Sequence, residues 1–305
     1  MPELPDITLY VEHLHRRTAG TTLLSLRLRS PFLLRTVDPP LSSAAPRRVL
    51  DVTRLGKRVV FALDGDLFLS LHLMIAGRLH WKKPGAKPPG KFGLAAFDFD
   101  QGTLLLTEAS AKKRAALHLV RGAPALATLD RGGLEPLDAD LPAFREALLR
   151  ESHTLKRALT DPRLFSGIGN AYSDEILHRA RLSPLRLSSA LSPDELSRLH
   201  SSTQSTLREW TDRLRTEAGD VFPEKVTAFR EGMAVHGRYG KPCPVCGTAV
   251  QRIRYAENEA NYCPRCQIGG RLLADRSLSR LLHHDWPKTI DELEERRRRT
   301  RPERS

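Results

Sequence analysis

The sequence is short of several residue classes, and each shortage excludes a kind of protein. Only 6% of its 305 residues are aromatic, and only four are cysteines. No stretch reaches the roughly 18 uninterrupted apolar residues that a membrane-spanning helix needs, so we expect no membrane protein. The first residues are acidic and lack an apolar segment, and so they predict no secretory signal. These absences favour a cytoplasmic protein with reduced thiols over a secreted, disulfide-bonded one.

Acidic residues are also too few to balance the basic ones. The chain has 36 Asp and Glu against 49 Lys and Arg, a formal net charge of +13. With 40% hydrophobic and 28% charged residues, it can still bury a core, and its length allows two domains. Because phosphate neutralisation releases counterions, a strongly basic protein most often binds nucleic acid. A generic basic protein or a binder of anionic membranes remains the alternative on charge alone.

The four cysteines form two C-x-x-C pairs separated by sixteen residues. The first pair is Cys243 and Cys246, and the second is Cys263 and Cys266. Each pair can offer two sulfurs from one tight turn to a tetrahedral ion, which is the spacing of a four-thiolate zinc ribbon. Two disulfides or a redox pair fit less well. We therefore expect one structural zinc ion, because four thiolates leave no coordination position for water or substrate.

The periodicity predicts an α+β multidomain chain. A helical stripe over 7–14 ends before Gly20, and short strand-like runs follow up to residue 120. The runs cover 24–28, 48–54, 58–63, 67–73, 94–99, 103–107 and 116–120. Many short strands after one helix indicate a β-sandwich with the helix packed on it. The expected domains are 1–130 (sandwich), 131–225 (helical), 226–275 (zinc ribbon) and 276–305 (basic tail).

The second expected domain is helical. Helices are predicted near 142–150, 153–165, 170–181 and 193–217, and a further short helix in the tail after 287. Ser192-Pro-Asp-Glu195 reads as a capping box at the start of the last long helix. Ser166-Gly-Ile-Gly-Asn170 is a glycine-rich turn leading into a helix. Exposed amides and the helix dipole make such a turn a candidate phosphate site, although most Gly-x-Gly turns merely reverse the chain.

The N-terminus carries a second chemical possibility. Initiator methionine is normally removed before proline, which would leave Pro2 as the first residue. Its secondary amine titrates near ~8, so a useful fraction is unprotonated at neutral pH and can attack an aldehydic sugar carbon. Glu3 beside it could move protons. Without further context, a proline and a glutamate at a helix start are ordinary residues.

Four separated motifs supply that context. Pro2-Glu-Leu-Pro-Asp6 resembles the start of the formamidopyrimidine-DNA glycosylase and endonuclease VIII family. Gly56-Lys-Arg58 and His72-Leu-Met74 with Gly77 are similar to motifs of its sandwich domain. Leu155-Lys156, followed by Gly167 to Glu175, resembles its helix–two-turn–helix. Gly237 to Cys243 leads into the zinc ribbon as in the family. The matches occur in family order over about residues 2–268.

The resemblance implies a base-excision-repair DNA glycosylase with AP-lyase activity. It implies that Pro2 is the nucleophile that forms a Schiff base, Glu3 the acid/base and Lys57 a cation near the sugar-phosphate. Met74 would fill the base stack vacated by the extruded nucleotide. The further DNA-binding residues would be His72, Lys156, Gly169 and Asn170. The partner would be damaged double-stranded DNA, bound by a cytoplasmic, nucleoid-associated monomer without contact to a membrane.

Two positions depart from the family pattern. The family ribbon has an arginine five residues before its third cysteine, where this chain has Asn258 between two glutamates. A neutral amide cannot grip a phosphate as a charged guanidinium does. The loop that carries an arginine and a phenylalanine in the oxidised-purine branch reads Glu108-Ala-Ser-Ala-Lys-Lys-Arg114 here. We therefore expect an altered lesion range and nicking mainly by β-elimination.

Two functions of other classes compete with this hypothesis. The same fold could bind lesions or shape DNA without turnover. Alternatively, the chain could be a zinc-ribbon protein of transcription or the ribosome, although neither the Pro-Glu pair nor the sandwich would then have a purpose.

Overall fold

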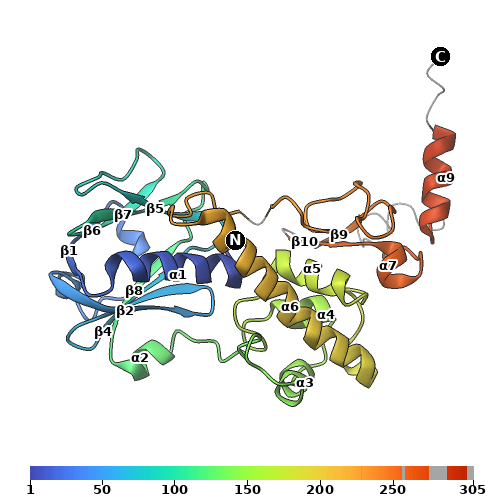
Figure 1. Cartoon of the computed structure of the whole chain (residues 1–305), viewed down its shortest axis with the longest axis horizontal. Helices are drawn as coiled ribbons and strands as arrows, with labels where there is room; N and C mark the ends of the chain where they lie inside the picture. Colours follow the sequence, from blue (N-terminus) through green and yellow to red (C-terminus); the bar gives the residue numbers. More distant parts are fainter. Residues whose placement is uncertain (228, 256–257, 275–286, 301–305) are drawn as a thin grey trace. The chain divides into compact units, whose positions relative to one another are not determined.

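The computed structural model describes residues 1–227, 229–255, 258–274 and 287–300 of the chain (Figure 1). The chain forms two compact units. The first comprises Met1–Gly133 with Leu207–Ala228, and the second comprises Leu134–Thr206 with Phe229–Ser305. One long helix, α6 (Pro193–Ala218), contributes residues to both units. In the described ranges, every helix is too short or too polar to cross a bilayer.

The first unit contains an antiparallel eight-stranded sheet in the order β5-β7-β6-β1-β2-β3-β4-β8. The strands are β1 (Thr22–Leu28), β2 (Arg47–Leu55), β3 (Arg58–Leu63), β4 (Leu67–His72), β5 (Gly77–Lys82), β6 (Gly93–Phe99), β7 (Gly102–Glu108) and β8 (Ala116–Arg121). Short helices connect or follow them: η1 (Pro31–Leu33), η2 (Leu41–Ala44) and α2 (Ala123–Ala127).

Two halves of this sheet share one core. They are joined where β1 pairs with β2, at Thr22–Arg48 and Leu23–Arg47. A single cluster of buried side chains draws on both halves, including Phe97 and Leu104 from one and Phe61 and Leu117 from the other. This is how two packed layers bury the inner faces of their strands. The expected fold class, a helix with a β-sandwich, a helical domain and a zinc ribbon, is confirmed.

Helix α1 (Leu4–Thr18) packs on that core. A capping box between Glu3 and Asp6 begins the helix, and the backbone N–H of Glu3 donates to Asp6 Oδ2 at 2.9 Å. Ile7, Tyr10 and Leu14, spaced three and four residues apart, are fully buried. The capping box thus fixes where the helix begins, and the buried face fixes the helix on the core, so the position of the chain's first residues is well defined.

The second unit begins with helices. These are α3 (Leu141–Leu149), α4 (Leu155–Thr160), α5 (Asn170–Arg179), η3 (Ser188–Ala190) and the first part of α6. The expected helix over 153–165 is shorter than predicted. It ends at Thr160 because Pro162 disfavours helical backbone at Asp161, whose ψ is 116°. The predicted capping box of α6 is present: Ser192 N donates to Glu195 Oε2 at 2.9 Å, and Glu195 N donates to Ser192 Oγ at 3.3 Å.

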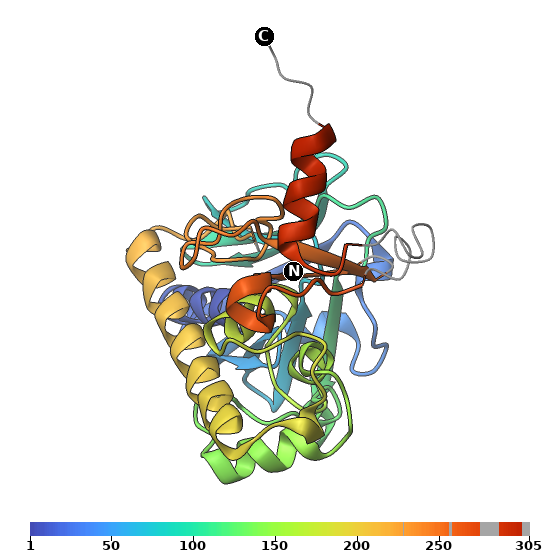
Figure 2. The ribbon, with the colours of Figure 1, turned by 90° about the vertical axis from the view of Figure 1, so that its right-hand side faces the viewer.

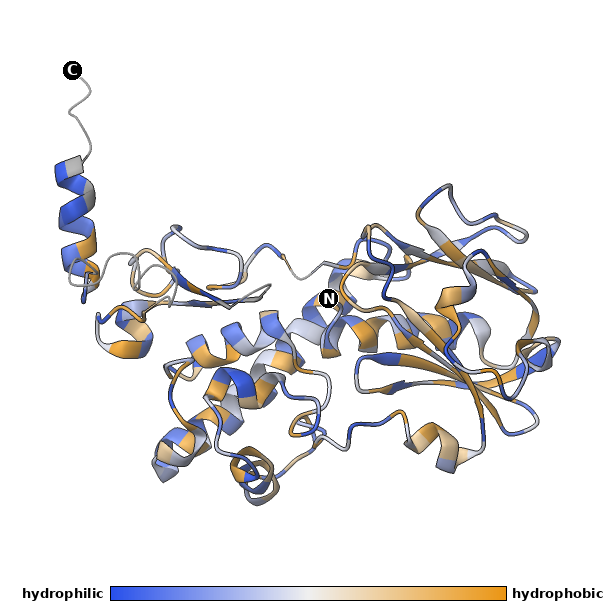
Figure 3. Ribbon diagram, turned by 180° about the vertical axis from the view of Figure 1, so that it is seen from behind, coloured by the Kyte–Doolittle hydropathy of each residue, from blue (hydrophilic) through white to orange (hydrophobic). Residues whose placement is uncertain are grey.

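The rest of this unit is a zinc-ribbon hairpin with a C-terminal helix. It consists of β9 (Gln251–Tyr255), β10 (Asn258–Tyr262), α7 (Pro264–Ile268) and α9 (Ile290–Thr300). Figure 2 places the base of α9 beside α7, and the Arg265–Asp291 ion pair at 2.6 Å joins the two helices. In Figure 3, α9 is almost wholly hydrophilic, in agreement with its sequence of acidic then basic residues.

Candidate active site

The N-terminal motif lies at the start of α1. Pro2 and Glu3 are both buried, and Glu3 is the N-cap residue of the helix. Burial lowers the pKa of the amine of Met1 first, and the cations Arg78 and Lys57 lower it further, while Glu3 and Asp6 act in the opposite direction. An amine with a lowered pKa is unprotonated, and hence nucleophilic, over more of the neutral range. The structure therefore brings the start of the chain within the field of Lys57.

Lys57 occupies a tight turn between β2 and β3. Gly56 has a φ of +59°, a left-handed conformation that glycine adopts without strain. In the sheet register, Arg58, which follows Lys57, pairs with His72 at the end of β4. Lys57 and His72 thus come from the same end of neighbouring strands, as the motif spacing alone could not have established.

A tight turn presents Met74 beyond that strand end. Met74 has a φ of +52°, in the left-handed region that non-glycine residues rarely adopt. Gly77 N donates to the carbonyl of Leu73 at 2.9 Å, and a Cβ on Gly77 would lie 2.3 Å from that same oxygen. Only glycine therefore closes this turn, which explains the residue in the sequence motif. The side chain of Met74 is half-buried.

His72 stabilises the Met74 turn through a hydrogen bond. The backbone N–H of Met74 donates to His72 Nδ1 at 3.1 Å. Burial and, to a lesser extent, the nearby cations Arg58 and Lys57 together lower the pKa of His72 to about 4. The ring is therefore neutral at pH 7, and because Nδ1 accepts, Nε2 carries the proton. A phosphate contact of His72 remains a prediction, and it would be made by a neutral N–H donor.

Arg78 is a site residue that the sequence did not single out. Its Nη1 donates to the carbonyls of Gly77 at 2.6 Å and Ile75 at 3.2 Å. It therefore stabilises the turn that carries Met74, and its charge also lowers the pKa of the Met1 amine. An arginine in an alternating strand pattern gives no signal of this role, because the role depends on contacts with the preceding turn that the sequence does not show.

The segment after β7 is fixed by Glu108. This carboxylate is 1% exposed and accepts the backbone N–H groups of Arg114 at 3.0 Å and Ala115 at 3.1 Å. The Nζ of Lys113 donates to the carbonyl of Glu108. The loop keeps its cations exposed at Lys112, Lys113 and Arg114.

In the second unit, the glycine-rich turn leads into α5 as expected. Gly169 is the N-cap residue, and Gly167 has a φ of +77°. Lys156, from α4, is 9% exposed; its Nζ donates to the carbonyl of Asn170 at 2.6 Å and to Asp174 Oδ1 at 2.5 Å. Lys156 thus holds the start of α5, and the role in DNA binding that the sequence predicts for it would be to position that helix end.

Two buried carboxylates of α5 tie the zinc-ribbon segment to the helices. Asp174 also accepts from Asn261 of β10 at 3.2 Å and lies 2.8 Å from His236 Nδ1. Glu175 accepts the backbone N–H groups of 234–236 at 2.7 to 2.9 Å. Burial raises the pKa of Glu175, and these hydrogen bonds oppose that effect. Neighbouring acidic residues in the sequence thus have a structural task that composition did not reveal.

The four cysteines form the zinc site. The sulfurs of Cys243, Cys246, Cys263 and Cys266 all lie within 4.8 Å of one another. Gly247, with a φ of +72°, closes the first pair, and its N–H donates to the carbonyl of Cys243 at 2.9 Å. Four soft thiolates in this arrangement suit a tetrahedral Zn²⁺. His178 Nε2 lies 3.3 Å from Cys243 Sγ and orients that ligand from α5.

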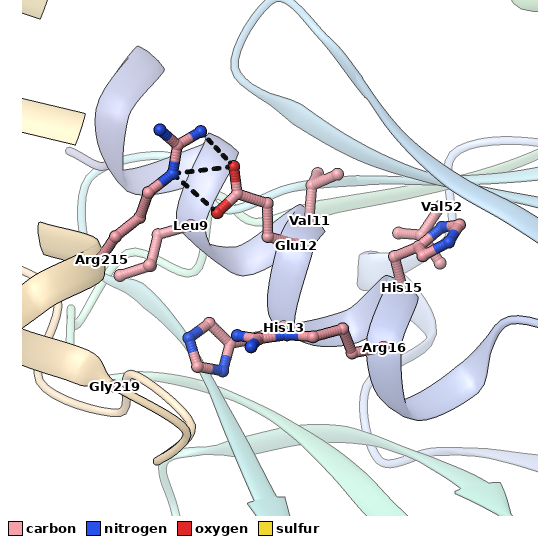
Figure 4. Close-up of a pocket in the computed structure, with 9 residues that line it drawn as sticks. All are labelled: Leu9, Val11, Glu12, His13, His15, Arg16, Val52, Arg215 and Gly219. Atoms are coloured by element: carbon pink, nitrogen blue, oxygen red, sulfur yellow. Dashed lines mark hydrogen bonds and ion pairs between the residues drawn. The ribbon is translucent and has the colours of Figure 1, made fainter. Parts of the chain in front are cut away.

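A pocket of about 500 Å³ lies elsewhere in the first unit (Figure 4). It is lined by Leu9, Val11, Glu12, His13, His15, Arg16, Val52, Arg215 and Gly219. Arg215 Nη2 and Glu12 Oε1, 2.6 Å apart, join the end of α6 to α1 across it. Its lining includes neither Pro2 nor Lys57, so the pocket is not the place where the N-terminal motif acts.

Two positions raised by the sequence fall partly outside the described residues. Glu257 lies outside them, as does the side chain of Asn258. Of the expected tail 276–305, residues 276–286 and 301–305 lie outside the described residues, while its helix is present as α9.

Comparison with known proteins covers most of the chain. The formamidopyrimidine-DNA glycosylase N-terminal domain matches residues 1–113, the H2TH domain of that enzyme matches 133–217, and a zinc finger found in FPG and IleRS matches 240–268. A formamidopyrimidine-DNA glycosylase of Heliobacterium modesticaldum is 34% identical over 277 residues, 88% of this chain and 100% of that relative. The MutM (Fpg) crystal structure from Thermus thermophilus has a TM-score of 0.73 at 33% identity and covers 87% of this chain and 98% of that one. A Lactococcus lactis Fpg complex with abasic-site DNA shares the fold, with a TM-score of 0.76 at 24% identity, 87% of this chain and 99% of that chain.

Proposed function

Because the chain belongs to the formamidopyrimidine-DNA glycosylase family, we propose that it is a base-excision-repair DNA glycosylase with AP-lyase activity. Its substrate is a damaged base in double-stranded DNA, and it works as a monomer on chromosomal DNA in the cytoplasm. The observation that carries the proposal is the setting of the N-terminus: Pro2 and Glu3 are buried at the start of α1, and the cations Lys57 and Arg78 are near enough to lower the pKa of the adjoining Met1 amine.

The reaction begins once Met1 is removed. The unprotonated nitrogen of Pro2 attacks C1′ of the extruded nucleotide, and the base leaves with the bond electrons and takes up a proton. The nitrogen then loses its proton, and the C1′–O4′ bond breaks as O4′ takes up a proton, which opens the sugar and leaves an iminium. This iminium draws electrons from C2′, which loses a proton while the 3′ phosphate departs. Water then releases the unsaturated sugar from the nitrogen. Glu3 moves the protons, and Lys57 stabilises the charge of the phosphate.

The remaining predicted DNA contacts belong to this proposal. Met74 fills the space left by the extruded nucleotide, and His72 donates Nε2–H to the backbone. The amides at Gly169 and Asn170 face a phosphate at the start of α5, where the helix dipole favours negative charge. Lys156 fixes the position of that helix end. The zinc ion, held by the four cysteines, supplies structure to the ribbon and no chemistry.

Borohydride trapping on a duplex with an abasic site tests the mechanism. Reduction of an iminium leaves the protein covalently bound to DNA, which a lesion-binding protein without turnover would not do. We expect trapping by the natural chain and its loss in a form that retains Met1, because the nitrogen is then an amide. A Pro2→Gly variant should trap less. Undiminished trapping in either altered form would contradict the role of Pro2.

A further inference from the structure

Three strands of the first unit end at the same side of the sheet. Gly77, the first residue of β5, pairs with Glu108, the last residue of β7. Gly93, the first residue of β6, pairs with Thr107. The turn before β5, the residue before β6 and the loop after β7 therefore lie next to one another. A hydrogen bond of 2.8 Å from Glu108 N to the carbonyl of Phe92 fixes this arrangement.

Apolar side chains gather at these strand ends and face solvent. Phe92 is 43% exposed and Ile75 is 56% exposed, and Met74 beside Ile75 is partly exposed. Each stands on a segment whose backbone is held by hydrogen bonds. Exposed apolar side chains that share one corner of a sheet are a candidate contact surface. We call Met74, Ile75 and Phe92 the apolar tip.

Cations surround the aromatic member of the apolar tip. Lys91 Nζ lies 5.2 Å and Lys113 Nζ lies 5.5 Å from the centre of the Phe92 ring. Cation–π contacts of this length hold the ring while leaving the ammonium groups hydrated. An aromatic face flanked by two exposed ammonium groups suits a nucleic acid, whose base stacks on the ring while its phosphates meet the charges.

The loop after β7 lacks an aromatic residue, and Phe92 lies beside this loop. Residues 109–114 supply three cations but contain no aromatic residue. The strand register places Phe92, from a different loop, directly beside them. The aromatic and the charges of this corner thus come from two segments that are 20 residues apart in the sequence.

We propose that Phe92 stacks on the base left unpaired when the damaged nucleotide is extruded, with Met74 and Ile75 filling the adjacent gap. The proposal rests on the proposed function, since it requires distorted double-stranded DNA as the occupant. Phe92 then sets how strongly the protein prefers a lesion over intact duplex. Lys91 and Lys113 contact the flanking phosphates without regard to sequence.

The test compares binding of the full-length zinc-loaded protein to two duplexes. One carries a tetrahydrofuran abasic analogue opposite 2-aminopurine, and the other is intact. Stacking on an aromatic ring is worth ~1–3 kcal/mol per base, so Phe92→Ala should weaken binding to the abasic duplex about 5- to 150-fold. Binding to intact duplex should change less than twofold. The natural protein should also quench the fluorescence of 2-aminopurine when Phe92 stacks on that base. Phe92→Ala should lose this quenching, and Phe92→Trp should restore both the affinity and the quenching.

Leu24→Ala is the matched control. Leu24 is 48% exposed in the same unit, but its neighbour Leu23 pairs with Phe99, at the opposite end of β6 from Gly93. It should bind both duplexes like the natural protein. Equal affinity of Phe92→Ala and the natural protein for the abasic duplex, or an equal loss on both duplexes, would overturn the proposal.

The two proposals fail in different ways. Borohydride trapping by the natural protein tests the chemistry, whereas the analogue duplex cannot react and reports binding alone. Trapping without any effect of Phe92→Ala on affinity overturns the role of Phe92 and leaves the glycosylase intact. Lesion-selective binding that depends on Phe92, without trapping, overturns the lyase and supports the apolar tip.

Discussion

Two histidines of the first unit, His13 and His72, have strongly lowered pKa values and so couple its stability to pH. His13 on α1 is 1% exposed, and its ring meets Phe222 edge-on at 6.1 Å between centres. Burial lowers the pKa of His13 to about 4, with Arg16 and Arg17 adding to the effect. His72 has its pKa lowered to about the same value. Both rings are neutral in the folded protein at pH 7.

This predicts a loss of stability in mild acid. The unfolded chain takes up these protons near pH 6.5, and the folded chain only near pH 4, so the unfolding free energy falls as pH drops between these values. Each histidine contributes at most about 3 kcal/mol. Denaturant titrations from pH 7 to 4.5 measure the slope, which His13→Gln should reduce. The exposed His15, changed to Gln, is the control, and an unchanged slope in His13→Gln would contradict the prediction.

The asparagine at position 258 leads to a prediction about products. Replacing a charged phosphate contact by a neutral one weakens the interaction by about 1.5–3 kcal/mol. We expect the natural chain to leave mainly the unsaturated sugar on the 3′ end of nicked abasic DNA. Asn258→Arg should raise the fraction of 3′-phosphate product on a sequencing gel. If the natural chain already gives mostly 3′ phosphate, position 258 does not limit the second elimination.

At the residue level, the sequence predicted the metal ligands but not the side chains that hold turns and loops in place. The cysteine spacing alone predicted the zinc site, because two C-x-x-C pairs have few other uses. Arg78 and Glu108 were missed, since a brace for a neighbouring turn is defined by contacts distant in sequence. Asp174 lay inside a recognised motif, yet its partners His236 and Asn261 are 62 and 87 residues away.

Among the elements, α5 connects several parts of the second unit through buried hydrogen bonds and ion pairs. Its N-terminal end is held by Lys156 and its buried face by Asp174 and Glu175. Removing one member of a buried ion pair costs about 3–5 kcal/mol, because the other charge is left without a partner.

Lys156→Met should therefore destabilise the protein while leaving its salt dependence of DNA binding unchanged. A lysine that directly neutralises a phosphate contributes about one unit to the slope of log K against log salt. The Lys156 amine is instead committed to Asp174. Urea unfolding and binding at several salt concentrations measure the two effects. The exposed Lys112→Met is the control, and we expect it to reduce the slope without destabilisation. A reduced slope in Lys156→Met would make this residue a phosphate contact.

Two of the failures of element prediction have a clear physical reason. Strand β5 was not predicted, because only Ile75 and Ala76 separate it from Met74 and no loop containing Pro or Asp marks its start. Helix α4 was drawn too long, since the apolar residues Leu164 and Phe165 continue its pattern after the proline has ended it. Periodicity finds buried faces, whereas the ends of elements depend on local backbone chemistry.

At the scale of the whole molecule, the two units should respond differently to loss of zinc. Thiolate binding supplies much of the folding energy of a ribbon that otherwise has one hairpin. A chelator should therefore raise hydrogen exchange over 240–268 and over 234–236, which Glu175 holds. The core strands of the first unit, such as β3, should keep their protection. Retained protection of 240–268 with four alkylatable thiols would contradict a zinc-dependent ribbon.

The C-terminal helix lies beyond the family match, which ends at residue 268. Nevertheless, Leu272 N donates to the carbonyl of Lys288 at 2.8 Å, Ile290 N donates to that of Gly270 at 2.9 Å, and Ile290 is fully buried. A gene shortened to the boundary of the recognised domains would encode a ribbon whose edge is stripped of these partners and open to proteases. Residues 270–272 and 288–290 thus contribute hydrogen bonds and buried surface to the ribbon, and a ribbon cut at residue 268 would lack both.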